Sequence, residues 1–222
     1  MADWAPRRFR FVVFDWDGTL ADSTALIAES ICLACGDVGE PVPDTATARY
    51  VIGLGLPDVL ARIAPGLPKE RHHELTDRYR HHFLAHDDAI PLFDGVRELL
   101  AELDAAGFLL GVATGKSRAG LERAMAQQRL EGRFAATRCA DEGFPKPHPD
   151  MLLHLIDRVG VDPGETLMIG DTTHDVELAH GAGAAALAVT YGAHESADLA
   201  RLAPLATVDS IPELRRWLHA NA

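Results

Sequence analysis

The segment FVVFDWDGTLADS, residues 11–23, changes abruptly from apolar to acidic. Its first four residues are aromatic or β-branched, which is typical of a buried β-strand. Two aspartates, Asp15 and Asp17, and a Gly-Thr turn follow directly. Two carboxylates this close repel each other unless a cation or a shared proton stabilises them. We therefore expect this pair to have a partner elsewhere in the chain.

Five short apolar runs, this one included, predict the strands of a sheet. They are FRFVVFD (9–15), FLLGVAT (108–114), FAATRCA (134–140), TLMIGD (166–171) and AAALAVTYG (184–192). Helical patterns separate most of them, and the segment 95–107, for example, places its leucines at helical spacing and ends in Gly107. Strands that alternate with helices predict an α/β fold, in which helices cover both faces of a parallel sheet.

A long segment between the first two strands predicts a second domain. Residues 23–89 exceed what a single crossover needs, and their helical patterns are interrupted by VPDT, GLGLPD and APGLPK. The segment is polar and rich in His and Arg, unlike the strands around it. We predict a small α-helical domain at residues 23–89, inserted into a core domain made of residues 1–22 and 90–222.

The composition of the chain limits the kinds of molecule that it is expected to bind. The 222 residues include 21 Lys and Arg against 33 Asp and Glu, so the formal net charge is −12. This acidic balance argues against nucleic acid or an anionic membrane as a general partner. No apolar run is long enough to span a bilayer, and MADWAPRRFR (1–10) lacks the pattern of a signal peptide. We therefore expect a cytoplasmic protein, a monomer or a homodimer.

The cysteines and the clustered histidines have ordinary explanations. The cysteines number three, which fits a reducing compartment better than a disulfide framework. Cys32 and Cys35 form a C-x-x-C pattern inside a helical segment without a second ligand pair, so buried small residues are favoured over a redox or zinc site. His82 and His86 lie one helical turn apart in a charged segment, where a solvated helix face is favoured over a metal site.

Polar residues gather where the predicted strands end. Taken singly, each is explained as a turn residue, a helix N-cap or a surface amine. Ligands of an open parallel sheet, however, bind beyond the carboxyl ends of its strands. Together these residues supply what metal-assisted phosphoryl transfer needs: oxygen ligands for Mg²⁺, a nucleophile, an acid/base and phosphate donors. The cation would also remove the repulsion between the first two carboxylates. The residues are Asp15, Asp17, Thr114, Gly115, Lys146, Asp171 and Asp175.

Four segments in chain order resemble the motifs of the haloacid dehalogenase superfamily. They are DWDGTLADS (15–23), VATGKS (112–117), KPHPDM (146–151) and IGDTTHD (169–175). The resemblance runs from about Phe11 to Gly192 and is nearest to the phosphoglycolate-phosphatase-like branch. It implies a Rossmann-like core, a helical cap that closes over the substrate, and a Mg²⁺-dependent phosphatase that acts on a small phosphorylated metabolite.

The resemblance also implies roles for the first two motifs. Asp15 resembles the nucleophile that becomes a phospho-aspartate. Asp17 resembles the acid/base that protonates the leaving alcohol and then activates water, and its backbone carbonyl helps to bind Mg²⁺. Thr114 and the backbone at Gly115, where the family often has Asn, resemble the phosphate cradle.

The last two motifs complete the implied site. Lys146 resembles the cation that neutralises the nucleophile and the phosphoryl group. Asp171 resembles an acidic Mg²⁺ ligand. Asp175 resembles either a second ligand or an outer partner that holds water or Lys146. His174, which lies between the two acids, has no implied role.

Other functions remain open at this point. A sugar phosphomutase of the same branch would need its cap to hold a bisphosphate while excluding water. A dehalogenase is disfavoured because that branch lacks the aspartate found here as Asp17. A catalytically silent binding module would have lost at least one of Asp15, Asp17, Lys146 and Asp171, and all four are present.

Substrate choice in this family comes from the cap. The candidates lie in ARYVIGLGLPD (48–58), where glycines would let the backbone approach a ligand. A loop between two cap helices explains the same residues equally well. The candidates are Arg49, Gly53, Leu54 and Gly55.

Overall fold

A computed structural model describes residues 8–222 and has a six-stranded parallel sheet at its centre, in the order β3-β2-β1-β4-β5-β6. This order confirms the predicted Rossmann-like α/β fold. The predicted core domain includes residues 1–7, which lie outside the described residues. The strands are β1 (Phe11–Phe14), β2 (Leu109–Thr114), β3 (Ala136–Cys139), β4 (Thr166–Gly170), β5 (Ala185–Val189) and β6 (Thr207–Val208).

The chain changes direction across the sheet at β1. The strands β2 and β3 extend from one side of β1, whereas β4, β5 and β6 extend from the other. In register, Phe14 is paired with Val112 of β2 and with Ile169 of β4. The carboxyl ends of β1 and β4 therefore form the switch point at which doubly wound sheets bind ligands.

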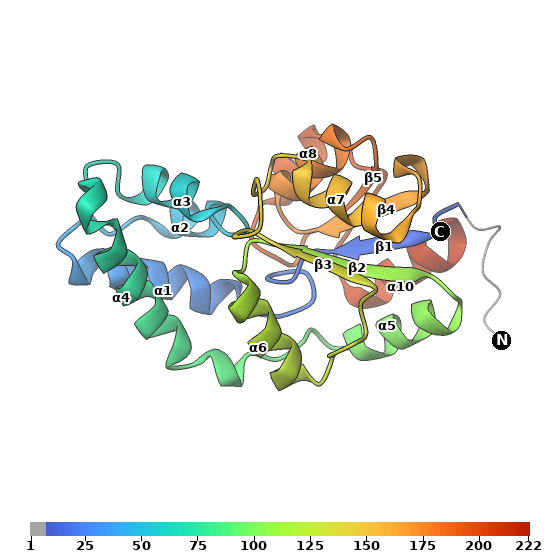
Figure 1. The fold of residues 1–222 in the computed structure, drawn as a ribbon, viewed down its shortest axis with the longest axis horizontal. Coiled ribbons are helices and arrows are strands. Elements are labelled where there is room, and N and C mark those ends of the chain that lie inside the picture. Colours follow the sequence, from blue (N-terminus) through green and yellow to red (C-terminus); the bar gives the residue numbers. More distant parts are fainter. Residues whose placement is uncertain (1–7) are drawn as a thin grey trace.

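Helices cover both faces of the sheet (Figure 1). Because successive strand residues point to opposite faces, Val12 and Phe14 pack into one hydrophobic layer and Phe11 and Val13 into the other. The first layer contains side chains of α5 (Val96–Ala105), α6 (Arg118–Gln128) and α10 (Ile211–Asn221). The second contains those of α7 (Asp150–Val159), α8 (Thr173–Gly181) and α9 (Ser196–Arg201); the 3₁₀ helix η3 (Pro163–Glu165) precedes β4.

The predicted insertion is helical and lies beyond the carboxyl ends of the strands, at one end of the molecule (Figure 1). It has an apolar cluster of its own, in which Ile31, Leu60 and Leu75 are buried. We call residues 23–89 the cap, and their status as a separate domain stays a prediction. Its elements are α1 (Thr24–Asp37), α2 (Thr45–Tyr50), α3 (Leu56–Ile63), η1 (Lys69–Arg71), α4 (His72–Leu84) and η2 (Asp87–Ala89).

The two connections between cap and core run side by side. The amide of Asp22 donates to the carbonyl of Pro91 (3.0 Å), and the amide of Phe93 donates to the carbonyl of Leu20 (3.0 Å). The helix α6 braces this junction, because the Arg123 guanidinium pairs with the Asp87 carboxylate (2.7 Å). The cap therefore leaves and rejoins the core at a single place.

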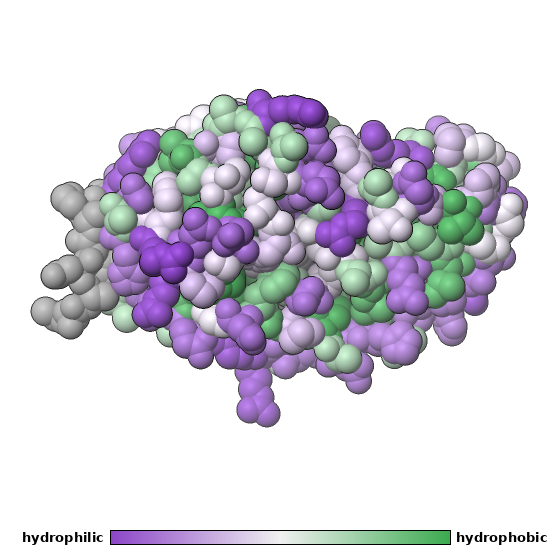
Figure 2. Space-filling view, turned by 180° about the vertical axis from the view of Figure 1, so that it is seen from behind, coloured by the Kyte–Doolittle hydropathy of each residue, from purple (hydrophilic) through white to green (hydrophobic). Residues whose placement is uncertain are grey.

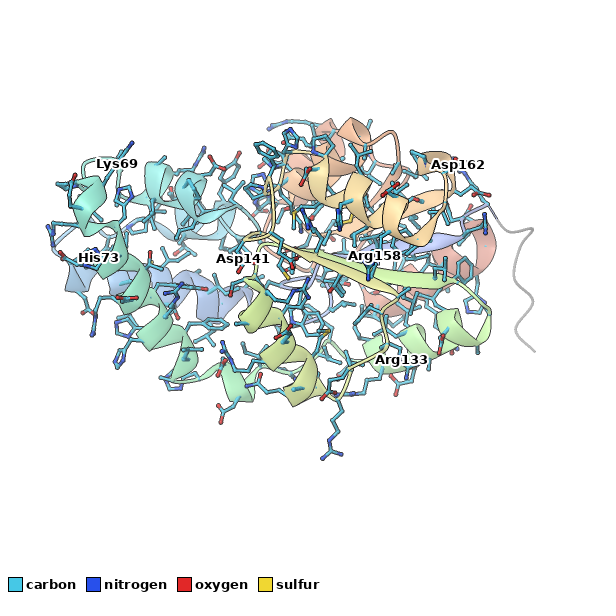
Figure 3. All side chains as sticks on the ribbon, in the orientation of Figure 1. Lys69, His73, Arg133, Asp141, Arg158 and Asp162 are labelled. Carbon is cyan, nitrogen blue, oxygen red and sulfur yellow. The ribbon has the colours of Figure 1, made fainter. Side chains whose placement is uncertain are left out.

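The surface is largely hydrophilic. Figure 2 shows hydrophilic residues spread over one face with smaller hydrophobic groups between them, as expected when 24% of the residues are charged. Lys69 and His73 lie in the part of the cap that is farthest from the sheet (Figure 3). Farther along α4, His82 pairs with Asp37 of α1 (2.7 Å). Within residues 8–222, none of the helices combines the length and the apolar character that a membrane crossing needs.

Candidate active site

Four of the predicted site residues meet at the carboxyl end of the sheet. Asp15 follows β1, Asp171 follows β4, Asp175 lies in the first turn of α8, and Lys146 lies in the loop between β3 and α7. Each is at most 1% exposed. One carboxylate oxygen from each aspartate lies within 4.8 Å of one oxygen from each of the others. The sheet thus brings together residues that are far apart in the sequence.

The two oxygens of Asp15 have different surroundings. Its Oδ1 accepts a hydrogen bond from the amide of Trp16 (2.6 Å) and pairs with Lys146 Nζ (2.8 Å). Its Oδ2 is buried and has no hydrogen-bond partner among the described residues. Burial raises the pKa of Asp15 well above its ordinary value, and the nearby Asp175 and Asp171 raise it further against the opposing effect of Lys146.

Asp171 is held at both oxygens. The Thr19 hydroxyl donates to Oδ1 (2.7 Å) and the amide of Ala193 donates to Oδ2 (2.6 Å). Burial, followed by the charge of Asp175, raises the pKa of Asp171 to about 7. Three buried carboxylates facing one ammonium group have a deficit of positive charge, and all their ligand atoms are hard oxygens. These residues therefore fit Mg²⁺.

The two carboxylate oxygens of Asp175 have different partners. Its Oδ1 pairs with Lys146 Nζ (2.7 Å), so the ammonium bridges Asp15 and Asp175. Although burial disfavours the ammonium, these two carboxylates raise the pKa of Lys146 above its ordinary value. The Oδ2 of Asp175 accepts from the amide (3.0 Å) and the hydroxyl (2.7 Å) of Thr172, which closes a capping box on α8. Asp175 thus holds Lys146, and a further role as a direct Mg²⁺ ligand stays a prediction.

The carboxylate of Asp17 lies outside this trio. Its Oδ1 accepts a hydrogen bond from the Ser23 hydroxyl (2.6 Å) and pairs with Lys116 Nζ (3.0 Å). The same ammonium lies 5.0 Å from the ring centroid of Phe83 in the cap. A contribution of Asp17 to a metal through its backbone carbonyl stays a prediction. Sequence reasoning assigned no function to Ser23 or Lys116, although both lie within the quoted motifs.

The second motif lies against the cap. Thr114 is fully buried at the end of β2, and its hydroxyl accepts a hydrogen bond from the amide of Lys116 (3.2 Å). A Cβ atom on Gly115 would come within 2.8 Å of the Gly53 carbonyl oxygen. The backbone of the motif and the backbone of the cap loop therefore touch at this point, which explains a glycine at position 115.

The predicted cap residues also contact the core. Arg49 donates hydrogen bonds to the carbonyls of Gly192 and Ala193. A side chain on Gly55 would collide with the ring of Pro145, which immediately precedes Lys146. Gly53 has a left-handed φ of +88°, which favours glycine. The structure places these three residues at the rim of the site, and their effect on substrate choice stays a prediction.

A small pocket opens between cap and core beside Asp17. Phe83 of α4 forms part of its wall, and Lys116 and Arg123 supply positive charge. Asp17 and Asp87 line it as well, so each cation is paired with a carboxylate, Lys116 with Asp17 and Arg123 with Asp87. The lining is therefore aromatic and polar, with its positive and negative charges balanced.

Known proteins resemble this chain in sequence and in fold. Residues 12–189 match the haloacid dehalogenase-like hydrolase family. The probable phosphatase IndB of Dickeya dadantii is 35% identical over 215 residues, covering 94% of this chain and 93% of its own. A phosphoglycolate phosphatase of Vibrio vulnificus is 30% identical, covering 94% and 95%. The crystal structure of a predicted phosphoglycolate phosphatase from Haemophilus somnus has a TM-score of 0.83 at 24% identity, covering 94% and 97%. The chain accordingly belongs to the haloacid dehalogenase-like hydrolase family.

Proposed function

We propose that this hydrolase is a Mg²⁺-dependent phosphatase that cleaves a small phosphomonoester through an aspartyl-phosphate on Asp15. The observation that carries the proposal is the asymmetry of the Asp15 carboxylate. Lys146 and the Trp16 amide hold Oδ1, whereas the buried Oδ2 has no hydrogen-bond partner among residues 8–222. A positioned carboxylate with one oxygen available is suited to nucleophilic attack. Two relatives of this chain are named as phosphatases, which supports the same reaction.

In the first step, Asp15 Oδ2 attacks phosphorus and the bond from phosphorus to the substrate alcohol breaks. Lys146 keeps Asp15 oriented and offsets its charge. The carboxyl group of Asp17 gives its proton to the departing alkoxide. When bound by Asp15, Asp171 and the backbone carbonyl of Asp17, Mg²⁺ supplies positive charge that lets the anionic nucleophile approach the anionic phosphate.

In the second step, the phosphate leaves Asp15. The Asp17 carboxylate takes a proton from water, whose oxygen attacks phosphorus. The bond from phosphorus to Asp15 Oδ2 breaks, which releases phosphate and returns both aspartates to their starting states. Ser23 and Lys116 hold Oδ1 of Asp17 between the two proton transfers.

The substrate we propose is phosphoglycolate or a sugar phosphate. The aromatic ring and the paired charges of the pocket beside Asp17 support a small polar leaving group. We propose that Arg49, Gly53 and Gly55 influence substrate choice from the cap. A cytoplasmic location is supported by the three cysteines, all of which are free. We expect a monomer or a homodimer.

A panel of phosphorylated metabolites, each measured as kcat/KM with and without EDTA, tests this function. We expect Mg²⁺-dependent release of inorganic phosphate, with a clear preference among the substrates. Sugar monophosphates are also assayed with the corresponding bisphosphate, because isomerisation without phosphate release would identify a mutase. Undiminished hydrolysis in excess EDTA would show that the proposed mechanism is wrong.

A further inference from the structure

Arg49 connects the cap to one short loop of the core. It lies in the last turn of α2 and is half-buried. Its Nη2 donates to the carbonyl of Gly192, and its Nε donates to the carbonyl of Ala193 (3.1 Å). Both hydrogen bonds of this guanidinium thus go to main-chain oxygens across the boundary between cap and core. A charged donor makes such bonds stronger than neutral ones.

The opposite edge of the same loop contacts Asp171. The amide of Ala193 donates to Oδ2 of Asp171 (2.6 Å), and the amide of His194 donates to the main-chain oxygen of Asp171 (3.3 Å). The loop also packs tightly here, because a side chain on Gly192 would collide with that of Asp171. Arg49 and Asp171 are therefore bound to opposite edges of one stretch of backbone.

The two sets of hydrogen bonds share the same peptide groups. The Gly192 carbonyl and the Ala193 amide belong to one planar peptide unit, and the Ala193 carbonyl and the His194 amide belong to the next. In each unit, Arg49 binds the oxygen and Asp171 binds the N–H group. Because a peptide group is rigid, fixing its oxygen also fixes the direction of its N–H. A donor on the oxygen also polarises the group and strengthens the bond that its N–H makes.

The arrangement depends on a docked cap. Next to Arg49, the carbonyl of Tyr50 accepts hydrogen bonds from Nε2 of His174 (2.9 Å) and from Nε2 of His194 (3.0 Å). The Tyr50 ring stacks on the His194 ring, with the two centroids 5.0 Å apart. These contacts hold the end of α2 against the loop. If the cap moved away, Arg49 would leave both carbonyls, and the two peptide units would lose the group that orients them.

We propose that Arg49 is a positioning residue, which orients Asp171 through the two peptide units of residues 192–194 when the cap is docked. The proposal rests on the proposed function in one respect, namely that Asp171 is a metal ligand. It follows that docking of the cap strengthens metal binding. By linkage, a bound metal ion must favour the docked cap to the same degree.

Metal affinity without substrate tests this coupling. Mn²⁺, which also prefers oxygen ligands, is titrated into the metal-free full chain and followed by electron paramagnetic resonance. We compare the wild-type protein with Arg49→Met, which keeps an apolar stem, and with Arg49→Lys, which has only one nitrogen to offer the two carbonyls. The matched control is Arg78→Met, because Arg78 pairs with Asp37 inside the cap. Thermal unfolding in EDTA reports any loss of stability separately.

We expect the Kd for Mn²⁺ to rise at least about fivefold in Arg49→Met, the lower end of typical couplings between sites. Arg49→Lys should give a smaller rise, and Arg78→Met should stay within about twofold of the wild-type protein by the same measure. An unchanged Kd in Arg49→Met, or an equal rise in Arg78→Met, would overturn the inference. A change in relative kcat/KM between substrates with an unchanged Kd would leave Arg49 with the proposed effect on substrate choice alone and would overturn the positioning role. If the wild-type protein bound no Mn²⁺, the proposed metal site itself would fall, and this inference with it.

Discussion

The two aspartates that follow β1 differ in their partners, and the difference supports the separate roles proposed for them. Asp15 is paired with Lys146, inside a cluster of acids, whereas Asp17 is paired with Lys116 and Ser23 beside a pocket. A nucleophile needs a fixed orientation and an available oxygen. A proton donor instead needs access to the leaving group.

Substitution of these aspartates should separate the two steps of the reaction. Asp15→Asn removes the attacking charge, so we expect no phospho-enzyme and a loss of turnover by several orders of magnitude. Asp17→Asn leaves the nucleophile in place but removes the proton donor and the base. An aryl phosphate with a good leaving group should then label Asp15 and stall. Rapid quench with labelled substrate, followed by peptide mapping, measures this. Label on another side chain, or steady turnover by Asp15→Asn, would contradict the assignment.

His174 should give the fold a dependence on pH. It is 2% exposed, and burial lowers its pKa from 6.5 to about 4. Because the folded-state pKa lies below the unfolded-state pKa, the neutral ring favours the folded protein. Its contribution to stability is therefore complete above pH 6.5 and is lost as the pH falls toward 4. The total is on the order of 3 kcal/mol, since one pKa unit corresponds to about 1.4 kcal/mol.

The measurement is urea unfolding in EDTA at pH values between 7 and 4. His174→Phe keeps a ring against Tyr50, whose centroid lies 5.1 Å from that of His174, but this ring cannot gain a proton. We expect a flatter dependence of unfolding free energy on pH in this variant. The control is His81→Phe, which replaces an exposed histidine of α4. An equal slope in the wild-type and His174→Phe proteins would contradict the prediction.

At the scale of elements, the sequence predicted the strands better than the contacts between them. Apolar runs of six to nine residues identified β1 to β5, which have four to six residues each. The strand β6 has only two residues, Thr207 and Val208, and so carries no periodicity to detect. Arg49 illustrates why contacts between elements are harder to predict. It reaches Asp171 through peptide groups, which exist at every position and therefore leave no signal in the sequence.

The contacts that the glycines of the site make also leave no signal in the sequence. Glycines in the cap were expected to let the backbone approach a ligand, which stays a prediction, and Gly53 lies against Gly115 of the core. The four motif residues Asp15, Lys146, Asp171 and Asp175 were predicted to meet, and they do, because parallel strands end at one edge of the sheet. Contacts between the motifs of the core follow from strand topology, whereas contacts between cap and core depend on a docking geometry that periodicity does not encode.

A side chain at position 115 should keep the cap from docking. The Cβ of Gly115→Ala would meet the backbone of Gly53, whose oxygen, carbonyl carbon and Cα would lie 2.8, 2.9 and 2.9 Å away. Backbone atoms can move aside less easily than the end of a flexible side chain. The cap loop as a whole must therefore shift away from position 115. We expect kcat/KM to fall about 100-fold for every substrate, as misplacement by about 1 Å does in other enzymes. Gly66→Ala is the control, because a Cβ there meets nothing within 4 Å. A fall in kcat/KM for some substrates only would contradict the explanation that the cap fails to dock.

At the scale of the whole molecule, cap and core each have their own apolar clusters. The sheet is covered by two hydrophobic layers, and the cap packs around a third cluster that draws only Ala193 from the core among its buried members. The connections between the two parts run side by side through Asp22 and Pro91. The chemistry-bearing acids and Lys146 all belong to the core. If the cap is a separate domain, as predicted, it can move without displacing these four side chains.

The predicted domain boundaries can be tested by removing the cap. Because the amide of Asp22 lies 3.0 Å from the carbonyl of Pro91, a short Gly-Ser link can replace residues 23–89 without stretching the core. We expect the shortened chain to unfold cooperatively and to bind Mn²⁺ more weakly, since it lacks Arg49. Hydrolysis of a small aryl phosphate should persist at a reduced rate, whereas the preference among metabolites should disappear. Circular dichroism melts, Mn²⁺ titration and the metabolite panel measure these effects. A shortened chain that fails to fold would show that residues 23–89 are part of the core's own fold, and one that keeps the full substrate preference would place specificity in the core.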